Sequence, residues 1–367
     1  MPRALLPALL LLLTTPSFAA ERKTTVDVVG QAFHINGQPT YAGRSYNGKK
    51  VEGLLMNSRM VQGVFDDLNA ETRTMWKYPD GGAFDADRNT REFVAAMPEW
   101  RKRGLLAFTI NFQGGSPQGY SAKQPWVNSA FTETGVLRPE YAVRMERILD
   151  KADELGMAVI LGYFYFGQGK VFPDDAAATA ATRNATDWVI AKGYRNVIIE
   201  IANEANHAGY PEVIKPARAG ELIKLVQEQS KGKVKNAAGR LYVSTSLTGG
   251  QVPGESIVKP SDYILLHGNG QTPEKVRSMV RRTRQVAGYR DQPIVFNEDD
   301  HFDFDKPENN MLAAVGEYAS WGYFDFRKKG EKFEDGYQSV PVDWGITGAR
   351  KRAFFDLLER VTGADGK

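Results

Sequence analysis

The feature that most constrains the fold of this 367-residue chain is a repeated alternation of short apolar runs with amphipathic segments. A strand followed by a helix, repeated along a chain, is typical of parallel βα units. Eight such units predict an α/β fold of the (β/α)8 (TIM) barrel type, with a doubly wound parallel sheet as the second choice. The fifth unit is the weakest because its return segment is short. The expected strands are 40–46, 105–112, 158–166, the start of 196–210, 241–247, 262–268, 293–300 and 321–327.

Three segments outside this alternation predict how the barrel is finished. Residues 26–39 read as an opening β-hairpin with a turn at Asn36-Gly37, and this hairpin could plug the bottom of the barrel. Residues 47–89 and 113–138 are rich in Gly, Ser, Asn and Gln and would leave the top of the barrel after strands one and two. Long loops in that position shape substrate clefts.

The N-terminus resembles a secretory signal peptide. Arg3, an apolar run from Ala4 to Leu13 and small residues before Ala20 predict cleavage near Ala19 or Ala20. We therefore expect a signal peptide at 1–20, one catalytic domain at 21–367, and a secreted or periplasmic protein. The apolar run is too short for stable membrane insertion, and the absence of a nearby cysteine excludes the usual bacterial lipid attachment.

Composition adds two expectations. With no cysteine, the chain has neither disulfides nor a thiolate metal site, so its core alone must hold it together. A formal net charge of +3 gives no reason to expect a nucleic-acid partner, and the basic run 277–285 reads as a solvated helix face.

Polar residues stand where the predicted strands end. In a β/α barrel these ends share one face, so the side chains converge there. Two carboxylates, Glu204 and Glu298, follow apolar runs at the ends of strands four and seven. Facing carboxylates are what glycosidic bond cleavage requires, one to protonate the leaving oxygen and one to attack or to activate water. The other strand-end candidates are Arg44, Asn111, Tyr163, Tyr165, Asn203, His267 and Trp321.

With these residues in place, the chain resembles a divergent clan A retaining glycoside hydrolase of the cellulase-like, family 5-like kind. The motifs behind the resemblance are "IANEA", containing Asn203 and Glu204, and "IVFNEDD", containing Glu298. The resemblance implies that Glu204 is the general acid/base, Glu298 the nucleophile, and Asn203 a donor to the sugar 2-hydroxyl. It also implies that His267 lies near the nucleophile and that Trp321 forms the aromatic floor of the cleaved sugar's subsite.

The chain departs from this family at several strand ends. An Arg is expected to end strand two and a His strand three, whereas this chain has Asn111, then Tyr163 and Tyr165. Asn269 stands where a Tyr is expected after strand six. We hypothesise that Arg44, on the predicted first strand, replaces the missing Arg as the charge partner of Glu298.

The expected function is retaining hydrolysis of a β-linked oligo- or polysaccharide by double displacement, with no cofactor and no metal. Two alternatives stay open: a barrel that binds carbohydrate without cleaving it, and a metal-dependent hydrolase using His267, Glu298 and the following acidic cluster. That cluster, Asp299, Asp300, Asp303 and Asp305, could also form a Ca²⁺ site. Loop charges are the favoured interpretation of these aspartates.

Overall fold

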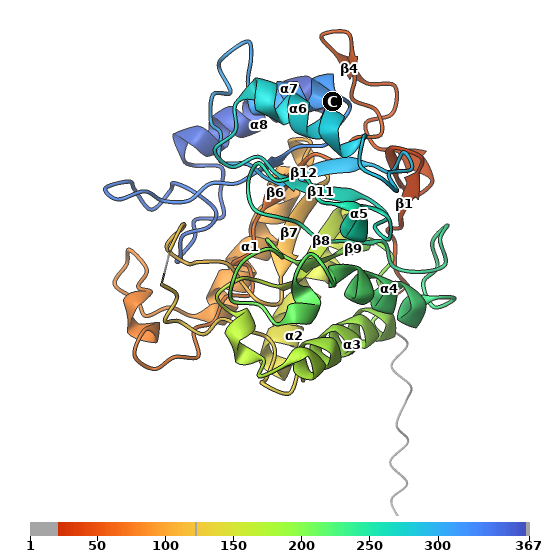
Figure 1. The fold of residues 1–367 in the computed structure, drawn as a ribbon. Coiled ribbons are helices and arrows are strands. Elements are labelled where there is room, and N and C mark those ends of the chain that lie inside the picture. Colours follow the sequence, from red (N-terminus) through yellow and green to blue (C-terminus); the bar gives the residue numbers. More distant parts are fainter. Residues whose placement is uncertain (1–20, 122, 365–367) are drawn as a thin grey trace, which may run out of the picture.

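Eight parallel strands form the centre of the fold, and helices surround them (Figure 1). The structure, a computed structural model, describes residues 21–121 and 123–364. The predicted signal peptide at 1–20 lies outside the described residues. The strands of the barrel are β6 Asn57–Arg59, β7 Ala107–Asn111, β8 Ala158–Phe164, β9 Val197–Ala202, β10 Val243–Ser244, β11 Ile264–His267, β12 Ile294–Glu298 and β13 Gly322–Tyr323.

The strands close into a ring in the order of the sequence. A six-stranded parallel sheet runs β10-β9-β8-β7-β6-β13, and β11 pairs with β12. On one side Ser320 joins the two sheets. Its amide donates to the Ile294 carbonyl and its carbonyl accepts from the Phe296 amide, both at 2.9 Å. On the other side the Asp262 amide donates to the Val243 carbonyl at 2.9 Å. The predicted (β/α)8 barrel is therefore confirmed.

The helices begin and end at the residues that the sequence offers for capping. Asp85 and Asp174 accept hydrogen bonds from the backbone amides of Arg88 and Ala177, and Gly156 ends its helix at φ +70°. Their apolar faces pack against the outside of the barrel and form the larger core cluster. The helices are α1 Ala86–Lys102, α2 Pro139–Leu155, α3 Asp175–Ala191, α4 Ala219–Ser230, α5 Glu255–Val258, α6 Pro273–Thr283, α7 Asn310–Gly316 and α8 Ala349–Thr362, with short 3-10 turns η1 Arg73–Met75, η2 Gly169–Val171 and η3 Glu212–Ile214.

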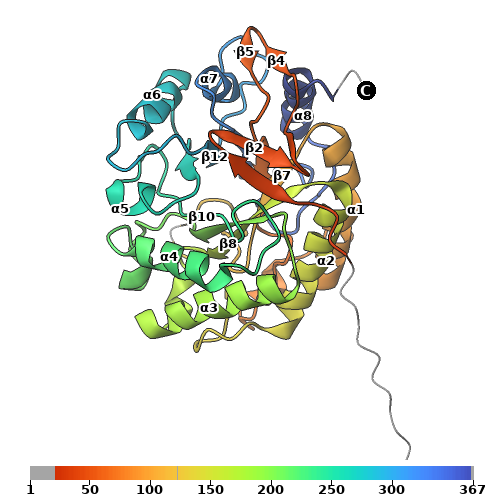
Figure 2. The ribbon, with the colours of Figure 1, turned by 90° about the vertical axis from the view of Figure 1, so that its right-hand side faces the viewer.

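The N-terminal hairpin lies across the bottom of the barrel, as the sequence predicts (Figure 2). Strands β1 Val26–Val29, β2 Ala32–Ile35 and β3 Gln38–Pro39 form a small antiparallel sheet. Asn36 and Gly37 both have positive φ, +52° and +78°, which the two-residue turn requires. Val26 and Phe33 are fully buried in a second core cluster that includes Leu106, Tyr263 and Val295 near the beginnings of the barrel strands. The hairpin thus seals the end opposite the predicted site.

The first barrel strand is not where the sequence predicts it. Residues 40–46 lie outside the ring and include β4 Ser45–Tyr46, which pairs with β5 Lys49–Lys50. Strand β6 instead comes from "MNSR", where Asn57 and Arg59 interrupt an apolar run. These polar side chains were poor strand signals because they belong to the polar interior of the barrel mouth.

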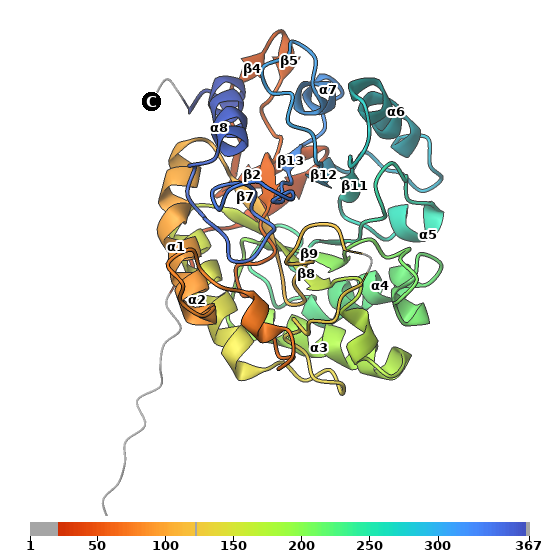
Figure 3. The same ribbon diagram turned by 90° about the vertical axis from the view of Figure 1, so that its left-hand side faces the viewer.

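Two long loops lie at the C-terminal end of the barrel, which Figure 3 shows. Residues 60–85 separate β6 from α1, and residues 112–138 separate β7 from α2. The predicted loop after strand two is confirmed, and the loop after strand one begins later than the predicted residue 47. Within the described part of the chain, no helix is both long and apolar enough to cross a membrane.

Candidate active site

Two carboxylates and a histidine meet at the C-terminal mouth of the barrel. Glu204 follows β9, His267 ends β11 and Glu298 ends β12. One oxygen of each carboxylate and one ring nitrogen of His267 lie within 4.8 Å of one another. The His267 Nδ1 is 3.1 Å from Glu204 Oε1 and 3.7 Å from Glu298 Oε2. The structure therefore brings together three residues that are 94 positions apart at most, counted from 204 to 298.

The local backbone holds Glu204 in an uncommon conformation. Its φ is +52°, in the left-handed region that side chains other than Asn, Asp and Gly seldom adopt. Its amide donates to Ser246 Oγ at 3.0 Å, which fixes the turn after β9 to strand five of the barrel. Backbone strain of this kind is found preferentially at functional sites.

Arg59 is the charge partner of Glu298. Its Nε lies 2.6 Å from Glu298 Oε2, and its side chain is fully buried. The contact is a close ion pair without the alignment of a good hydrogen bond. Arg59 also donates to Asn203 Oδ1 at 2.5 Å, which leaves the buried Asn203 Nδ2 with no protein partner among the described residues. A buried donor in that state suits a hydroxyl group of a ligand.

A third carboxylate, Glu200, lies below the mouth. It is fully buried within β9, and Arg59 NH1 is 3.5 Å from its Oε2. Ser246 Oγ donates to Glu200 Oε1 at 2.6 Å, and Asn297 Nδ2 donates to Oε2 at 3.2 Å. Because these partners satisfy its oxygens inside the protein, Glu200 supports Arg59 and is not available to a ligand.

Burial and mutual charge set the protonation of the site. Burial raises the pKa of Glu298, and the positive charges of His267 and Arg59 oppose that rise without cancelling it. Burial also acts to raise the pKa of Glu204, but the hydrogen bond from His267 and the positive charges of His267 and Arg59 together outweigh it, and the pKa is lowered. Burial lowers the pKa of His267, whereas the charges of Glu298 and Glu204 raise it above its ordinary value. These directions favour a protonated His267 beside an ionised Glu204.

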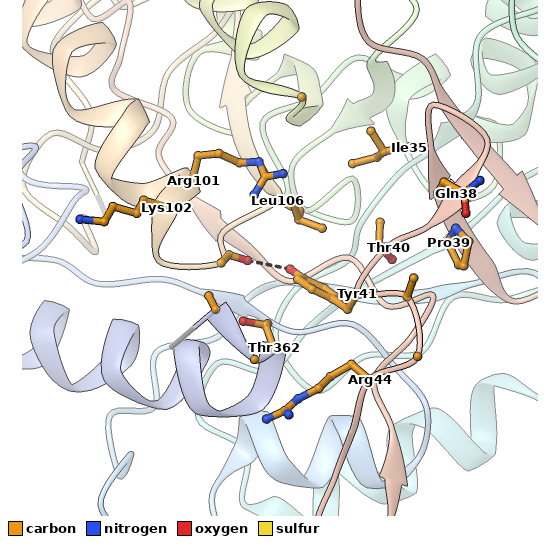
Figure 4. Close-up of a pocket in the computed structure, with 16 residues that line it drawn as sticks. Ile35, Gln38, Pro39, Thr40, Tyr41, Arg44, Arg101, Lys102, Leu106 and Thr362 are labelled. Carbon is orange, nitrogen blue, oxygen red and sulfur yellow. Dashed lines mark hydrogen bonds between the residues drawn. The ribbon is translucent and has the colours of Figure 1, made fainter. Parts of the chain in front are cut away.

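The hypothesis that Arg44 partners Glu298 is wrong. Arg44 lies at the other end of the barrel, where its Nε donates to the Val361 carbonyl at 3.0 Å and NH2 to that of Arg360, near the C-terminal end of α8. It lines a pocket of about 490 Å³ there. Figure 4 shows it near Thr362 and Tyr41. Arg44 thus caps a helix end, and the charge partner of Glu298 that we expected in Arg44 is Arg59.

The prediction that Trp321 forms the floor of a sugar subsite is also contradicted. Its side chain is fully buried, packs against Phe304 and Phe354, and donates from Nε1 to Asp299 Oδ2 at 2.8 Å. A ring without exposed surface cannot stack on a sugar. Trp321 is therefore a core residue.

The two predicted tyrosines face opposite ways. Tyr163 is buried toward the helices, with its hydroxyl 3.1 Å from Thr186 Oγ1 on α3, so it does not belong to the site. Tyr165 is buried beside the carboxylates, where burial and then the charge of Glu298 hold the pKa of its hydroxyl well above the usual value.

Asn111, the predicted strand-two residue, pairs with Gly162 across β7 and β8. Neither the nitrogen nor the oxygen of its side-chain amide has a hydrogen-bond partner within the described residues.

The acidic cluster after Glu298 contains one structural residue. Asp299 is fully buried, and its carboxylate contacts Trp321, Asn310 and His301, so the interpretation of it as a loop charge is wrong. Asp303 and Asp305 are exposed, as predicted for loop charges. Asp299, Asp300 and His301 have donor atoms within 4.8 Å of one another, but Asp299 already shares both oxygens with protein donors.

The loops above Glu298 add Asn269, which the sequence marks only as a departure from the family, and Tyr120, which the sequence does not reveal. Asn269 Nδ2 donates to Glu298 Oε1 at 2.8 Å, and it also donates to the Tyr120 hydroxyl. Tyr120 comes from the loop after β7 and lies 3.1 Å from Asp300 Oδ2. A sequence signal existed for Arg59 and Glu200, since each is a charge inside an apolar run. None existed for Tyr120.

The fold and this geometry can be compared with known proteins. No protein-family model matches the chain, and no curated protein matches it. A broad-specificity family 5 endoglucanase from Bacteroides salanitronis matches with a TM-score of 0.56 and 11% identity, over 84% of this chain and 93% of that one. A family 5 mannosidase from Rhizomucor miehei matches with a TM-score of 0.56 and 12% identity, over 95% and 100%.

The chain has the fold of the family 5 glycoside hydrolases. An endo-1,4-β-mannanase from Rhizomucor miehei has it as well, with a TM-score of 0.54 and 11% identity over 94% of this chain and 100% of that one. The resemblance inferred from the sequence is thus confirmed for the fold. Identities this low establish no substrate, so the activity has to follow from the site.

Proposed function

We propose that the protein is a retaining glycoside hydrolase that cleaves a β-linked glycan by double displacement. The observation that carries this proposal is the close approach of the Glu204 and Glu298 carboxylates, whose nearest oxygens lie within 4.8 Å at the mouth of the barrel. Retaining glycosidases hold their carboxyl groups about 5 to 5.5 Å apart, whereas inverting ones need room for a water molecule between carboxylate and sugar.

Glu298 is proposed as the nucleophile. The Arg59 guanidinium and the Asn269 amide contact its two oxygens, so the carboxylate is held in one orientation. In the first step an oxygen of Glu298 forms a bond to the anomeric carbon while the bond to the leaving oxygen breaks. Asn203 Nδ2 is available to donate to the sugar as positive charge develops on the ring.

Glu204 is proposed as the general acid and base. The leaving oxygen needs a proton, yet the pKa of Glu204 is lowered in the free site by its hydrogen bond to His267. A protonated His267, which its raised pKa favours, lies 3.1 Å from Glu204 Oε1, and proton transfer along this contact would yield a neutral Glu204. Glu204 then protonates the leaving group and, as a carboxylate, removes a proton from the water that releases the sugar from Glu298.

An exported enzyme consisting of one catalytic domain at 21–367 completes the proposal. Its support is the signal-peptide pattern at 1–20 and the single barrel that the described residues form. The substrate is an oligo- or polysaccharide, since the long loops 60–85 and 112–138 border the mouth.

The decisive experiment compares wild type, Glu204→Ala and Glu298→Ala on β-glucans, β-mannans and activated aryl β-glycosides. On the glycans both variants should lose at least about 10³-fold in kcat/KM, whereas on the aryl glycosides, whose leaving group needs no proton, the large loss should be confined to Glu298→Ala. Added azide should rescue Glu204→Ala and give a β-glycosyl azide, because azide then attacks the covalent intermediate on Glu298. In Glu298→Ala no such intermediate forms, so azide attacks the substrate directly and should give an α-glycosyl azide. Glu228→Ala, on the exposed surface of α4, is the control.

Other outcomes select the alternatives. Sugar binding by wild type without hydrolysis of any substrate would favour a carbohydrate-binding barrel. Hydrolysis that is abolished by a chelator and restored by a divalent metal would favour a metal-dependent hydrolase. Hydrolysis unaffected by either Glu substitution would refute the assignment of the site.

A further inference from the structure

The site contains a hydrogen-bonded chain that begins outside the catalytic pair. Asp300 Oδ2 lies 3.1 Å from the Tyr120 hydroxyl, which in turn contacts Asn269 Nδ2, and Asn269 Nδ2 lies 2.8 Å from Glu298 Oε1. The four residues come from the loop after β7, the end of β11, and the end of β12 with the loop that follows it. Three separate parts of the barrel mouth thus meet over one oxygen of Glu298.

The hydrogen bonds in this series of four residues have a fixed direction from donor to acceptor. A carboxylate only accepts hydrogen bonds, so the Tyr120 hydroxyl must donate its single proton to Asp300. The hydroxyl oxygen can then only accept from Asn269, which requires that the amide nitrogen faces it. The same nitrogen therefore faces Glu298, while Asn269 Oδ1 is buried without a hydrogen-bond partner among the described residues.

Without the hydroxyl, the contact of Nδ2 with Glu298 Oε1 alone would orient this amide among the described residues, and the amide could turn over once Glu298 is protonated. Its carbonyl oxygen would then face Glu298 Oε1, and an acceptor beside a carboxylate disfavours the charged form. A nucleophile has to be ionised to attack, so the orientation of this amide bears directly on the proposed reaction.

The position of Tyr120 is specified by packing. Its ring contacts Phe326 edge-on, with centroids 4.9 Å apart, and lies 5.8 Å from Phe324. The preceding Gly119 has φ +85°, and a Cβ there would lie 2.4 Å from the Phe326 ring. The loop is therefore held against the end of strand eight, with the hydroxyl aimed at Asn269 although the residue as a whole is 54% exposed.

We propose that Tyr120 and Asp300 are positioning residues that act through Asn269 to keep an N–H group, and not a carbonyl oxygen, directed at Glu298. This inference rests on the proposed role of Glu298 as nucleophile and adds to it a control by the loop after β7. It also accounts for the Asn that stands where the resemblance implies a Tyr: the phenol comes instead from another loop and acts through that Asn.

The test measures the ionisation of Glu298 directly, so it does not depend on finding a substrate. The protein is labelled with ¹³C at the Glu side-chain carboxyl, the resonance of Glu298 is assigned by its absence in Glu298→Gln, and its titration is followed by NMR. Tyr120→Phe should raise the midpoint by about one pH unit, because the freed amide can turn its carbonyl oxygen to accept from the protonated carboxyl, which stabilises the neutral form. In Asp300→Asn an amide at 300 can donate to the hydroxyl and reverse the chain, so adding Tyr120→Phe to it should raise the midpoint no further, while the lost charge of Asp300 acts on both variants alike.

The other groups that face Glu298 stay constant in both variants: Arg59 from β6, Tyr165 after β8, Glu204 after β9 and His267 from β11. Tyr289→Phe is the matched control, since its hydroxyl donates to the Gln292 carbonyl at 3.0 Å, outside this chain of contacts. Asn269→Ala should raise the midpoint, and adding Tyr120→Phe to it should raise it no further.

Three results would overturn the proposal: a Tyr120→Phe midpoint equal to that of Tyr289→Phe, a Tyr120→Phe shift of the same size with and without Asp300→Asn, or additive effects of Tyr120→Phe and Asn269→Ala. In an active enzyme, Tyr120→Phe should move the acidic limb of the kcat/KM profile upward with KM unchanged at high pH. Failure of the proposed function would be seen separately. The wild type would then hydrolyse none of the substrates, while the variants would still shift the titration midpoint of Glu298 in the NMR experiment.

Discussion

Replacing Arg59 with Met should test the electrostatic design of the site most severely. The side chains of Arg59 and Glu200 are fully buried and that of Glu298 is 4% exposed, so this substitution removes the one cation that contacts both carboxylates among the described residues. Met preserves most of the volume, and the change therefore reports charge more than packing.

The size of the effect follows from the geometry. At an effective dielectric constant of about 20, unit charges at the 2.6 Å separation of Arg59 and Glu298 attract by about 6 kcal/mol. Desolvation of the pair offsets part of this attraction. Removing one partner of a buried pair costs about 3 to 5 kcal/mol, and we expect a loss in this range at pH 8. Activity should also fall by at least about 10²-fold in kcat/KM.

The loss should depend on pH. Without Arg59 the pKa of Glu298 rises further above its unfolded-state value, so between those two values the folded protein binds more protons than the unfolded one. Stability of the variant therefore falls as pH rises, and its deficit relative to wild type should be larger at pH 8 than at pH 5. Urea denaturation at both pH values, followed by far-UV circular dichroism, gives the free energies of unfolding.

Arg103→Met provides the matched control. Arg103 also contacts two carboxylates, Asp356 and Glu359, each at 2.6 Å, but these are 54% and 24% exposed. Exposed pairs of this kind are worth about 0 to 1 kcal/mol, and the deficit should not vary between pH 5 and 8. If Arg59→Met cost no more than Arg103→Met, or lost the same amount at both pH values, the assignment of Arg59 as the charge partner of a buried Glu298 would be refuted.

Three further predictions concern residues around the site. Trp321→Phe removes a donor from the buried Asp299 and should lower the free energy of unfolding by about 1 to 3 kcal/mol while KM for the substrate stays unchanged; a raised KM would restore Trp321 as a sugar platform. Gly162→Ala would place a Cβ 2.2 Å from Asn111 Oδ1 and should cost about 1 to 3 kcal/mol in urea denaturation, whereas Gly209→Ala, which meets open space, should cost little; equal costs would contradict the close packing of β7 on β8. Burial lowers the pKa of Lys351 to about 8, so the unfolded chain binds more protons above that pH and stability should rise from pH 8 toward 9.5; a Lys351→Met variant with the same slope would assign the rise to another group.

Much of the fold could be predicted because its signals are local. Seven of the eight barrel strands fall within or at the predicted ranges, since each is an apolar run followed by an amphipathic helix. The exception is β6, where Asn57 and Arg59 interrupt the run. A strand whose inward residues are polar gives no apolar alternation, so the aromatic segment 40–46 appeared the better candidate.

The site was predictable to the extent that each residue carries its own signal. Glu204, Glu298, Asn203 and His267 stand at strand ends, and the structure brings them together. Arg44 and Trp321 also stand at predicted strand ends, but the first belongs to the wrong strand and the second points into the core. A strand-end position identifies the face of the barrel without indicating which way a side chain points.

The sequence by itself determined the barrel, the hairpin that closes it and the two carboxylates, because periodicity, turn residues and charges after apolar runs are properties of short segments. Only the tertiary structure decided that Arg59 partners Glu298, that Trp321 is buried, and that Tyr120 meets Asn269 and Asp300 over the nucleophile. These contacts join residues up to 239 positions apart, from 59 to 298. Such distances are set by closure of the ring, which no local pattern encodes.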